Sequence, residues 1–438
     1  MSIELISLLL FGSIFLLFAI GLPISFTLGA TSVIFLLIFL GTSHLLMVAT
    51  SLYGAMTRQT LMAIPLFIFM GNVLASSGIA REFFTAMYNW SGPIRGGLAM
   101  GTEVLCGVFA AMCGTTEGAT VTMGVTALPA MLDHGYDKNL AIGSLASGAL
   151  LGILIPPSIL AILYASISGT SIGKLYFAIL VPGLVLLTLY ILYNGIRCYM
   201  QPELAPALPK EERPSWQEKF ISLKGIALPA LIVFAVLGGI YSGATTPTEA
   251  AGVGALGVVI AALIHRKLSW TKLKEALLMT VRLTGMVAWL IMCVTLFAHV
   301  YGCLGIQQLV QNIVAALPIS GFGIIILMQL SIFLLGMVID DVSIILICTP
   351  IYLPIVTSLG FDPLWFAVLF MVNMQCAWMT PPYGFNLFIV KAVVPEWITM
   401  VDIYRAVIPF IGLQIACLLL VMFIPGIATW LPSMIIAR

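Results

Sequence analysis

The sequence has 438 residues, of which 61% are hydrophobic and 8% are charged, and its formal net charge is +1. Soluble domains are roughly 45–50% apolar and about 25% charged, so this chain has too few charges to cover a water-soluble surface. The composition excludes a cytosolic enzyme, a nucleic-acid-binding protein and a secreted disulfide scaffold. It predicts an integral membrane protein.

A transmembrane helix needs about 20 apolar residues. The spans that we expect, in chain order, are residues 4–22, 24–40, 60–78, 139–165, 175–198, 225–243, 248–264, 283–301, 363–390 and 405–425. The first stretch contains Glu4 and has neither a basic leader nor an Ala-x-Ala cleavage motif, so we expect a retained span and not a signal peptide.

Two further apolar stretches, 97–131 and 322–357, are interrupted by the polar segments Cys113–Gly118 and Asp340–Ser343. Each arm has about 15 residues, which is less than the spanning length. An unpaired backbone group in lipid costs several kcal/mol, so each interruption must be buried or line a wet cavity. The pattern favours two re-entrant helical hairpins. The alternative is a pair of ordinary spans joined by a polar turn.

A charged, Pro-rich segment, 199–224, predicts an exposed cytoplasmic linker between two halves, 1–198 and 225–438. A shift of 225 residues carries Pro129 onto Pro354, Asp137 onto Asp362 and Pro156-Pro157 onto Pro381-Pro382. Each half then holds five spans and one hairpin. Because five is odd, the second copy enters from the opposite face. The fold class that we predict is an all-α polytopic membrane protein with an inverted repeat, which is typical of secondary transporters.

The basic residues predict the orientation. With the N-terminus outside, all but three of the 18 Lys and Arg residues fall in inside loops, and the three exceptions are Arg58, Lys174 and Arg438. This asymmetry obeys the positive-inside rule. We therefore expect a periplasmic N-terminus, a first hairpin that opens from the cytoplasm and a second that opens from the outside.

The two Pro-Pro steps predict broken helices at equivalent positions. Proline lacks an N–H donor and bars helical geometry in the residue before it, so Pro156-Pro157 releases the carbonyls of Gly152 and Ile155 for a ligand. In transporters, unwound carbonyls hold Na⁺ and half-helix N-termini face anions. A plain kink is the alternative, but each step is matched by a polar hairpin tip, which favours functional unwinding.

Acidic residues inside a membrane are costly and usually functional. Asp340 and Asp341 lie at the second tip, which predicts coupling to a cation or a proton; the alternative is a helix N-cap. Glu249, in Thr246-Pro247-Thr248-Glu249, predicts a capping box. The four histidines are scattered, so we expect no metal site other than one for Na⁺, and no cofactor. The absence of a nucleophile–base pair disfavours an intramembrane enzyme, and the absence of a Walker loop disfavours an ATP-driven pump. A channel would need a continuous polar pore.

Four segments resemble the large membrane subunit of tripartite ATP-independent periplasmic (TRAP) transporters. They are Ala63–Asn72, Cys113–Thr120, Gly152–Ser158 and Thr246–Ala250, and the likeness extends over essentially the whole chain. The resemblance implies an elevator-type carrier in the bacterial inner membrane that imports a small organic acid anion with Na⁺. It also implies a small four-helix membrane subunit and a periplasmic binding protein as partners. A stand-alone carboxylate carrier of the same superfamily is the alternative.

The resemblance also implies the site residues. The first Na⁺ site would use Cys113, Thr115, Gly152, Ile155 and Pro157, and its symmetry mate Val338, Asp340, Ala377, Thr380 and Pro382. Substrate would meet the neighbouring tip residues Thr116 and Asp341. The family's first tip usually reads Ser-Gly-Ser-Ser, whereas this chain has Cys113-Gly114-Thr115-Thr116. The thiol of Cys113 affects the first Na⁺ site only if this residue binds the ion through its side chain and not through its carbonyl.

Overall fold

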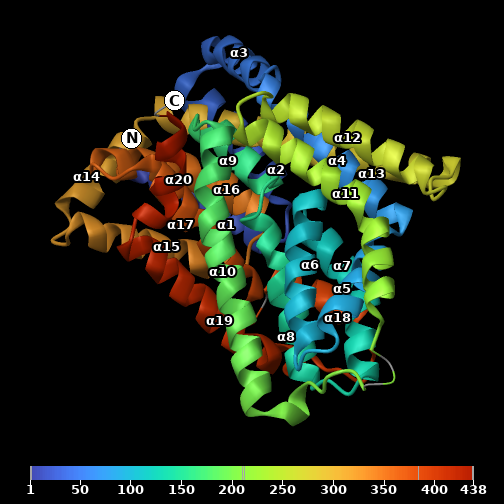
Figure 1. Ribbon diagram of the computed structural model, residues 1–438. Coiled ribbons are helices and arrows are strands. Elements are labelled where there is room, and N and C mark those ends of the chain that lie inside the picture. The colour runs from blue at the N-terminus through green and yellow to red at the C-terminus, as the bar shows by residue number, and fades with distance from the viewer. Residues whose placement is uncertain (1, 210, 212, 383, 437–438) are drawn as a thin grey trace.

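A computed structural model describes residues 2–209, 211, 213–382 and 384–436, except for the side chains of residues 79–81, 110–111, 113, 226 and 435–436. The described residues form helices and connecting turns, with no strand among them. Figure 1 shows α3 and both ends of the chain at one end of the molecule, and the connection from α10 to α11 at the opposite end.

The described residues of the first half form ten α-helices. Their bounds are α1 Ile3–Ala19, α2 Ile24–Phe35, α3 Leu45–Met56, α4 Ala63–Ser77, α5 Ile79–Ser91, α6 Gly97–Cys113, α7 Thr116–Asp133, α8 Lys138–Leu150, α9 Ile159–Ser168 and α10 Ile172–Met200. Short helical turns extend or connect them: η1 Leu36–Leu40, η2 Thr42–His44, η3 Gln59–Met62, η4 Leu151–Ile153 and η5 Pro202–Leu204.

The part of the second half that the structure describes also contains ten α-helices. They are α11 Trp216–Tyr241, α12 Pro247–Ile264, α13 Trp270–Cys303, α14 Ile306–Ala316, α15 Gly321–Gly336, α16 Asp341–Ser358, α17 Pro363–Met379, α18 Phe385–Val393, α19 Met400–Phe423 and α20 Gly426–Ile436.

Six described helices are long and apolar enough to cross a membrane, and a seventh qualifies if the bent α11, Trp216–Gly225 and Ala227–Tyr241, is one span. Those six are Gln59–Ser77 (η3 and α4), α10, α12, α13, α16 and α19. The chain is thus a multi-pass membrane protein. The remaining expected spans are shorter apolar helices, such as α1, α2, α8 and α17.

Several helices begin where the sequence supplies capping groups. Glu249 completes a capping box with Thr246, because Thr246 N donates to Glu249 Oε2 at 2.7 Å and Glu249 N donates to Thr246 Oγ1 at 3.3 Å. The predicted structural role of Glu249 is therefore confirmed. Asp137 and Asp362, which are 225 residues apart, cap α8 and α17 with their side chains.

The core centres on α8 and α17. Every residue from Leu140 to Leu150 and from Trp365 to Met379 is buried. A helix that is apolar on all sides must be surrounded by other helices. Gln375 Nε2 joins the two helices by donating to the Leu150 carbonyl at 2.5 Å, and these two residues are also 225 positions apart.

Two sequence-based expectations need correction. The expected arm length of about 15 residues is wrong for the second arms, since α7 and α16 have 18 residues each, close to the spanning length. Arm length alone therefore cannot distinguish hairpins from ordinary spans. The breaks predicted at the two Pro-Pro steps are confirmed, because the stretches 139–165 and 363–390 are each two helices.

The segment 199–224 is only partly an exposed linker. α10 continues to Met200 and α11 begins at Trp216. Between them Ala205 and Leu208 are buried, and their backbones bond to the loop before α6: Gly96 N donates to the Ala205 carbonyl at 3.2 Å, and Leu208 N to the Gly92 carbonyl at 3.0 Å. The apolar residues among the prolines explain the difference, because they pack against the base of α6.

Candidate functional site: two helix tips and two broken helices

The first tip is the turn between α6 and α7. Gly114 has φ +67°, a left-handed conformation that glycine adopts without steric cost. Thr115 is the N-cap of α7 and has an extended backbone, but its side chain makes no capping hydrogen bond. Thr116 is buried. The side chain of Cys113, the residue at which this chain departs from the family pattern, lies outside the described part of the structure.

The first broken helix lies against this tip. α8 tightens into η4, Pro156-Pro157 forms a cis peptide bond, and α9 starts at Ile159. The helical donors for the carbonyls of Gly152 and Ile153 would come from Pro156 and Pro157, which have no N–H group. These carbonyls can therefore face a ligand.

Tip and break are in direct contact. Ile159 N donates to the Gly114 carbonyl at 3.5 Å, and a Cβ on Gly114 would lie 3.5 Å from the Pro157 carbonyl oxygen. The arm α6 also meets the break, because a Cβ on Gly107 would lie 3.0 Å from the Ile155 side chain. The structure thus brings the backbones of the first predicted ligand set to one place.

The second tip joins α15 to α16, and Asp340 caps it. Asp340 Oδ2 accepts from Ser343 N at 3.0 Å, and Oδ1 accepts from Ser343 Oγ at 2.7 Å. Asp341 is buried, and its Oδ1 accepts from Val342 N at 2.7 Å. The capping alternative for Asp340 is therefore confirmed. It does not compete with a cation, since an ionised carboxylate offers about four lone-pair sites.

The second broken helix separates α17 from α18 around the cis peptide bond Pro381-Pro382. The end of α15 touches it closely: a Cβ on Gly336 would lie 2.3 Å from Ala377 Cβ. Two carbonyls here already accept hydrogen bonds, Ala377 from Thr380 N at 3.1 Å and Pro382 from Tyr404 Oη at 2.8 Å. Each retains a second lone pair for a ligand. The Val338 side chain is exposed, so a ligand role would fall to its carbonyl.

The two tips face each other. The carboxyl group of Glu117 lies near enough to those of Asp340 and Asp341 for their charges to interact. None of these three forms an ion pair with a described basic residue. Like charges at this depth need a cation or hydrogen-bond donors to offset them.

The helices that follow the breaks pack across the two halves. α18 packs on α7, where Thr120 Oγ1 donates to Asn386 Oδ1 at 2.7 Å, and α9 packs on α16. Asn386 Nδ2 also donates to the Ala146 carbonyl of α8 at 3.1 Å. Sequence reasoning did not identify Thr120, Asn386 or Tyr404. A polar residue within an apolar run is the signal that could have indicated Asn386.

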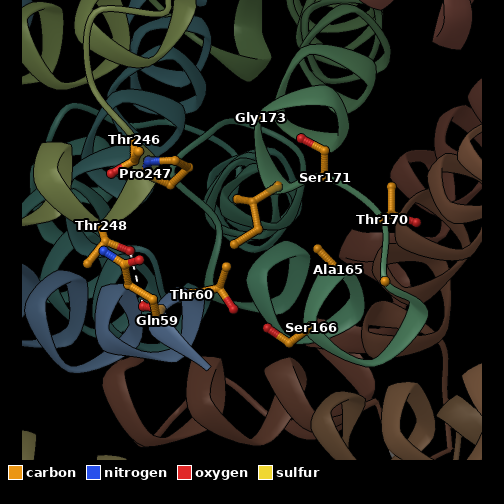
Figure 2. Close-up of a pocket in the computed structure, with 12 residues that line it drawn as sticks. Gln59, Thr60, Ala165, Ser166, Thr170, Ser171, Gly173, Thr246, Pro247 and Thr248 are labelled. Carbon is orange, nitrogen blue, oxygen red and sulfur yellow. Dashed lines mark hydrogen bonds between the residues drawn. The ribbon is translucent and has the colours of Figure 1, made fainter. Parts of the chain in front are cut away.

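Some of the cavities lie away from the tips. One of about 390 Å³ is lined by the end of α9 and the starts of η3, α10 and α12 (Figure 2). Its wall carries the hydroxyl groups of Thr60, Ser166, Thr170, Ser171 and Thr248. None of the predicted site residues lines it.

Known proteins match over almost the whole chain. The family described as "Tripartite ATP-independent periplasmic transporter, DctM component" matches residues 11–427. C4-dicarboxylate TRAP transporter large permease proteins of Vibrio cholerae and Pseudomonas aeruginosa are 31% and 34% identical. They cover 99% and 88% of this chain, which in turn covers 98% and 89% of them. A sialic acid TRAP transporter large permease protein of Vibrio cholerae is 29% identical over 97% of this chain.

Solved transporter structures share the fold at low identity. The Alcanivorax borkumensis YdaH transporter superposes with a TM-score of 0.65 at 14% identity, and each chain is covered to 91%. Neisseria gonorrhoeae MtrF gives a TM-score of 0.61, also at 14% identity, over 88% of this chain and 85% of its own. Together these matches show that the chain belongs to the DctM family of TRAP transporters, as a non-enzymatic large permease subunit.

Proposed function

We propose that this subunit imports a small organic acid anion across the bacterial inner membrane, coupled to Na⁺ and working as an elevator. The observation that carries the proposal is the pairing of each hairpin tip with its own broken helix, Gly114 with Pro157 and Gly336 with Ala377. In each pair, backbone carbonyls that lack a helical donor or keep a second lone pair lie beside the start of a helix. This is the arrangement in which transporters hold coupling ions and anions.

An inverted repeat is supported by contacts that recur between equivalent helices. α6 packs on α8 as α15 packs on α17, and α7 packs on α18 as α16 packs on α9. In the same way α10 packs on α17 as α19 packs on α8, and α4 packs on α12 as α13 packs on α2. A pseudo-two-fold axis between α8 and α17 would explain these matched pairs, because it exchanges the two halves.

The elevator proposal divides the chain into two bodies. Helices α6–α10 and α15–α19 contain both tips and both breaks, and α1, α2, α4 and α11–α13 would form the frame against which they slide. Within each group the helices pack extensively on one another. The segment 97–131 would then be a hairpin that opens from the cytoplasm, and 322–357 one that opens from the periplasm.

Two Na⁺ sites are proposed at the tip–break pairs. The first uses the carbonyls or side chains of Cys113, Thr115, Gly152, Ile155 and Pro157, and the second uses those of Val338, Asp340, Ala377, Thr380 and Pro382. Oxygen atoms dominate both sets, as a hard cation requires. Thr116 and Asp341 would face the anion between the tips.

The substrate and partners are proposed from the relatives. Three relatives at 30–34% identity are named C4-dicarboxylate permeases, so succinate is the first anion to test. A small membrane subunit and a periplasmic binding protein would complete the transporter. One relative, an isethionate permease named DctMQ, is longer than this chain, which covers 65% of it.

The experiment is succinate uptake into proteoliposomes that hold the permease, its small subunit and its binding protein. We expect accumulation with an inward Na⁺ gradient and none when choline replaces Na⁺. Uptake that follows a pH gradient in the absence of Na⁺ would contradict Na⁺ coupling. Uptake without the binding protein would favour a stand-alone carrier.

A further inference from the structure

The cavity of about 390 Å³ lies where the proposed moving body meets the proposed frame. Figure 2 shows Gln59, Thr246 and Thr248 on one side and Thr170 and Ser171 on the other. Several hydroxyl groups lie among apolar groups in the lining, and none of its described residues is acidic. Thr248 Oγ1 donates to the Gln59 carbonyl at 3.2 Å, which ties the start of α12 to η3. The cavity belongs to the end of the molecule opposite the α10–α11 connection (Figure 1).

Arg58 stands at the edge of this cavity. Its Nη1 donates to the Ser166 carbonyl near the end of α9, and Ser166 lines both the large cavity and a neighbouring one of about 180 Å³. The smaller cavity is lined by Arg58 itself, by α13 of the frame and by Pro350 of α16. Arg58 therefore lies between the two cavities, at the boundary between the proposed moving body and the proposed frame.

Most of the guanidinium remains available for a ligand. Arginine carries five N–H donors, and Arg58 forms no ion pair with any residue that the structure describes. The N-terminus of the 29-residue α10 also lines the cavity through Ser171, Ile172 and Gly173, and it adds partial positive charge. Guanidinium groups and hydroxyls together suit a carboxylate.

We propose that Arg58 and the hydroxyl-lined cavity form an outer subsite for the carboxylate of the transported anion. This inference rests on the proposed function and on its orientation, which puts the cavity on the periplasmic side. The physical need is clear: the tips carry Glu117, Asp340 and Asp341, whose charges repel an approaching anion. A cationic subsite at the outer boundary offsets that repulsion and raises the local anion concentration.

The first test compares variants in succinate uptake by the complete transporter. Arg58→Gln is expected to raise KM about fivefold with kcat nearly unchanged, since an exposed charge contact contributes up to about 1 kcal/mol. The KM of Arg58→Lys is expected to lie between those of wild type and Arg58→Gln, because lysine keeps the positive charge but lacks the planar guanidinium group. Lys174→Gln removes a charge from the same face without lining the cavity, and is expected to behave like wild type.

Two kinetic outcomes would overturn the subsite while the proposed function stands. One is an unchanged KM in Arg58→Gln. The other is a lower kcat at unchanged KM, which would make the Arg58–Ser166 contact a link between the two bodies and not a binding group.

The second test does not need the substrate. In a Cys-free chain within the complete transporter, Thr60→Cys is labelled from outside with anionic and with cationic methanethiosulfonate reagents. Arg58→Gln is expected to lower the ratio of the labelling rate with the anionic reagent to that with the cationic reagent about fivefold, and the effect should be larger at low ionic strength. Lys174→Gln is expected to leave this ratio unchanged. An unchanged ratio would overturn the inference, whatever the uptake assay shows.

Discussion

Asp340 illustrates how one side chain can hold a helix end and remain available to an ion. Its two carboxylate oxygens accept from Ser343, yet each keeps free lone pairs. The acid was evident in the sequence because it interrupts an apolar run, and the serine three residues later was the sign of a cap. Tyr404, which donates to the Pro382 carbonyl at 2.8 Å, gave no such signal, because its partner is distant in the chain.

Asp340→Asn separates capping from ion binding. Asn caps nearly as well as Asp, so the fold should persist. An amide oxygen carries only partial charge, and a lost charge-assisted contact of about 1.5–3 kcal/mol predicts roughly a tenfold or greater rise in the Na⁺ concentration for half-maximal uptake. This Na⁺ concentration is measured by titrating succinate uptake with Na⁺ in proteoliposomes that hold equal amounts of wild-type or variant protein.

Glu249→Gln is the matched control, because Glu249 only caps and Gln also completes a capping box. Its Na⁺ dependence should equal that of wild type. An unchanged Na⁺ dependence in Asp340→Asn would leave Asp340 a cap and nothing more. Asp341→Asn should instead alter the succinate dependence if its carboxylate faces the anion.

At the scale of elements, hydropathy predicted the long helices and proline the breaks, but not the short surface helices. α5 and α14 escape a search for 20-residue apolar runs, since each is amphipathic and has at most 13 residues. Both follow a left-handed glycine, Gly78 and Gly305. The contacts between tips and breaks could not be predicted, because they join segments about 40 residues apart through backbone atoms.

The packing of α7 on α18 predicts the effect of Thr120→Val. This substitution removes the hydroxyl that donates to Asn386 Oδ1 and leaves a buried acceptor unpaired, which costs about 1–3 kcal/mol. The purified protein should therefore melt at a lower temperature. Thr188→Val is the control, because Thr188 is exposed and bonds only to the Leu184 carbonyl within its own helix. Equal melting of the two variants would contradict the cross-half contact.

The close approach of α15 to the second break predicts the effect of Gly336→Ala. The added methyl would lie 2.3 Å from Ala377 Cβ, and overpacking of this kind costs about 1–3 kcal/mol. Gly323→Ala, in the same helix, meets only contacts of 3.4 Å or more and should be tolerated. Thermal melting should show a loss for Gly336→Ala and recovery when Ala377→Gly is added. If Ala377→Gly does not restore the melting temperature, the contact between residues 336 and 377 is not the cause of the lost stability.

For the whole molecule, the proposed orientation makes a direct topological prediction. Single cysteines in a Cys-free chain, Ser358→Cys at the end of α16 and Glu203→Cys after α10, are both at exposed positions. A membrane-impermeant thiol reagent added to intact cells should label Ser358→Cys, and should reach Glu203→Cys only after permeabilisation. The reverse pattern would overturn the orientation and the assignment of the outer cavity.

The central claim is that substrate and Na⁺ move together, and simultaneous flux measurement tests it most directly. Radiolabelled succinate and ²²Na⁺ are followed in the same proteoliposomes, with the complete transporter and a clamped membrane potential. We predict that succinate-dependent Na⁺ influx accompanies succinate uptake at a fixed ratio, and that both fall together in Asp340→Asn. Succinate uptake without any Na⁺ movement would contradict the claim.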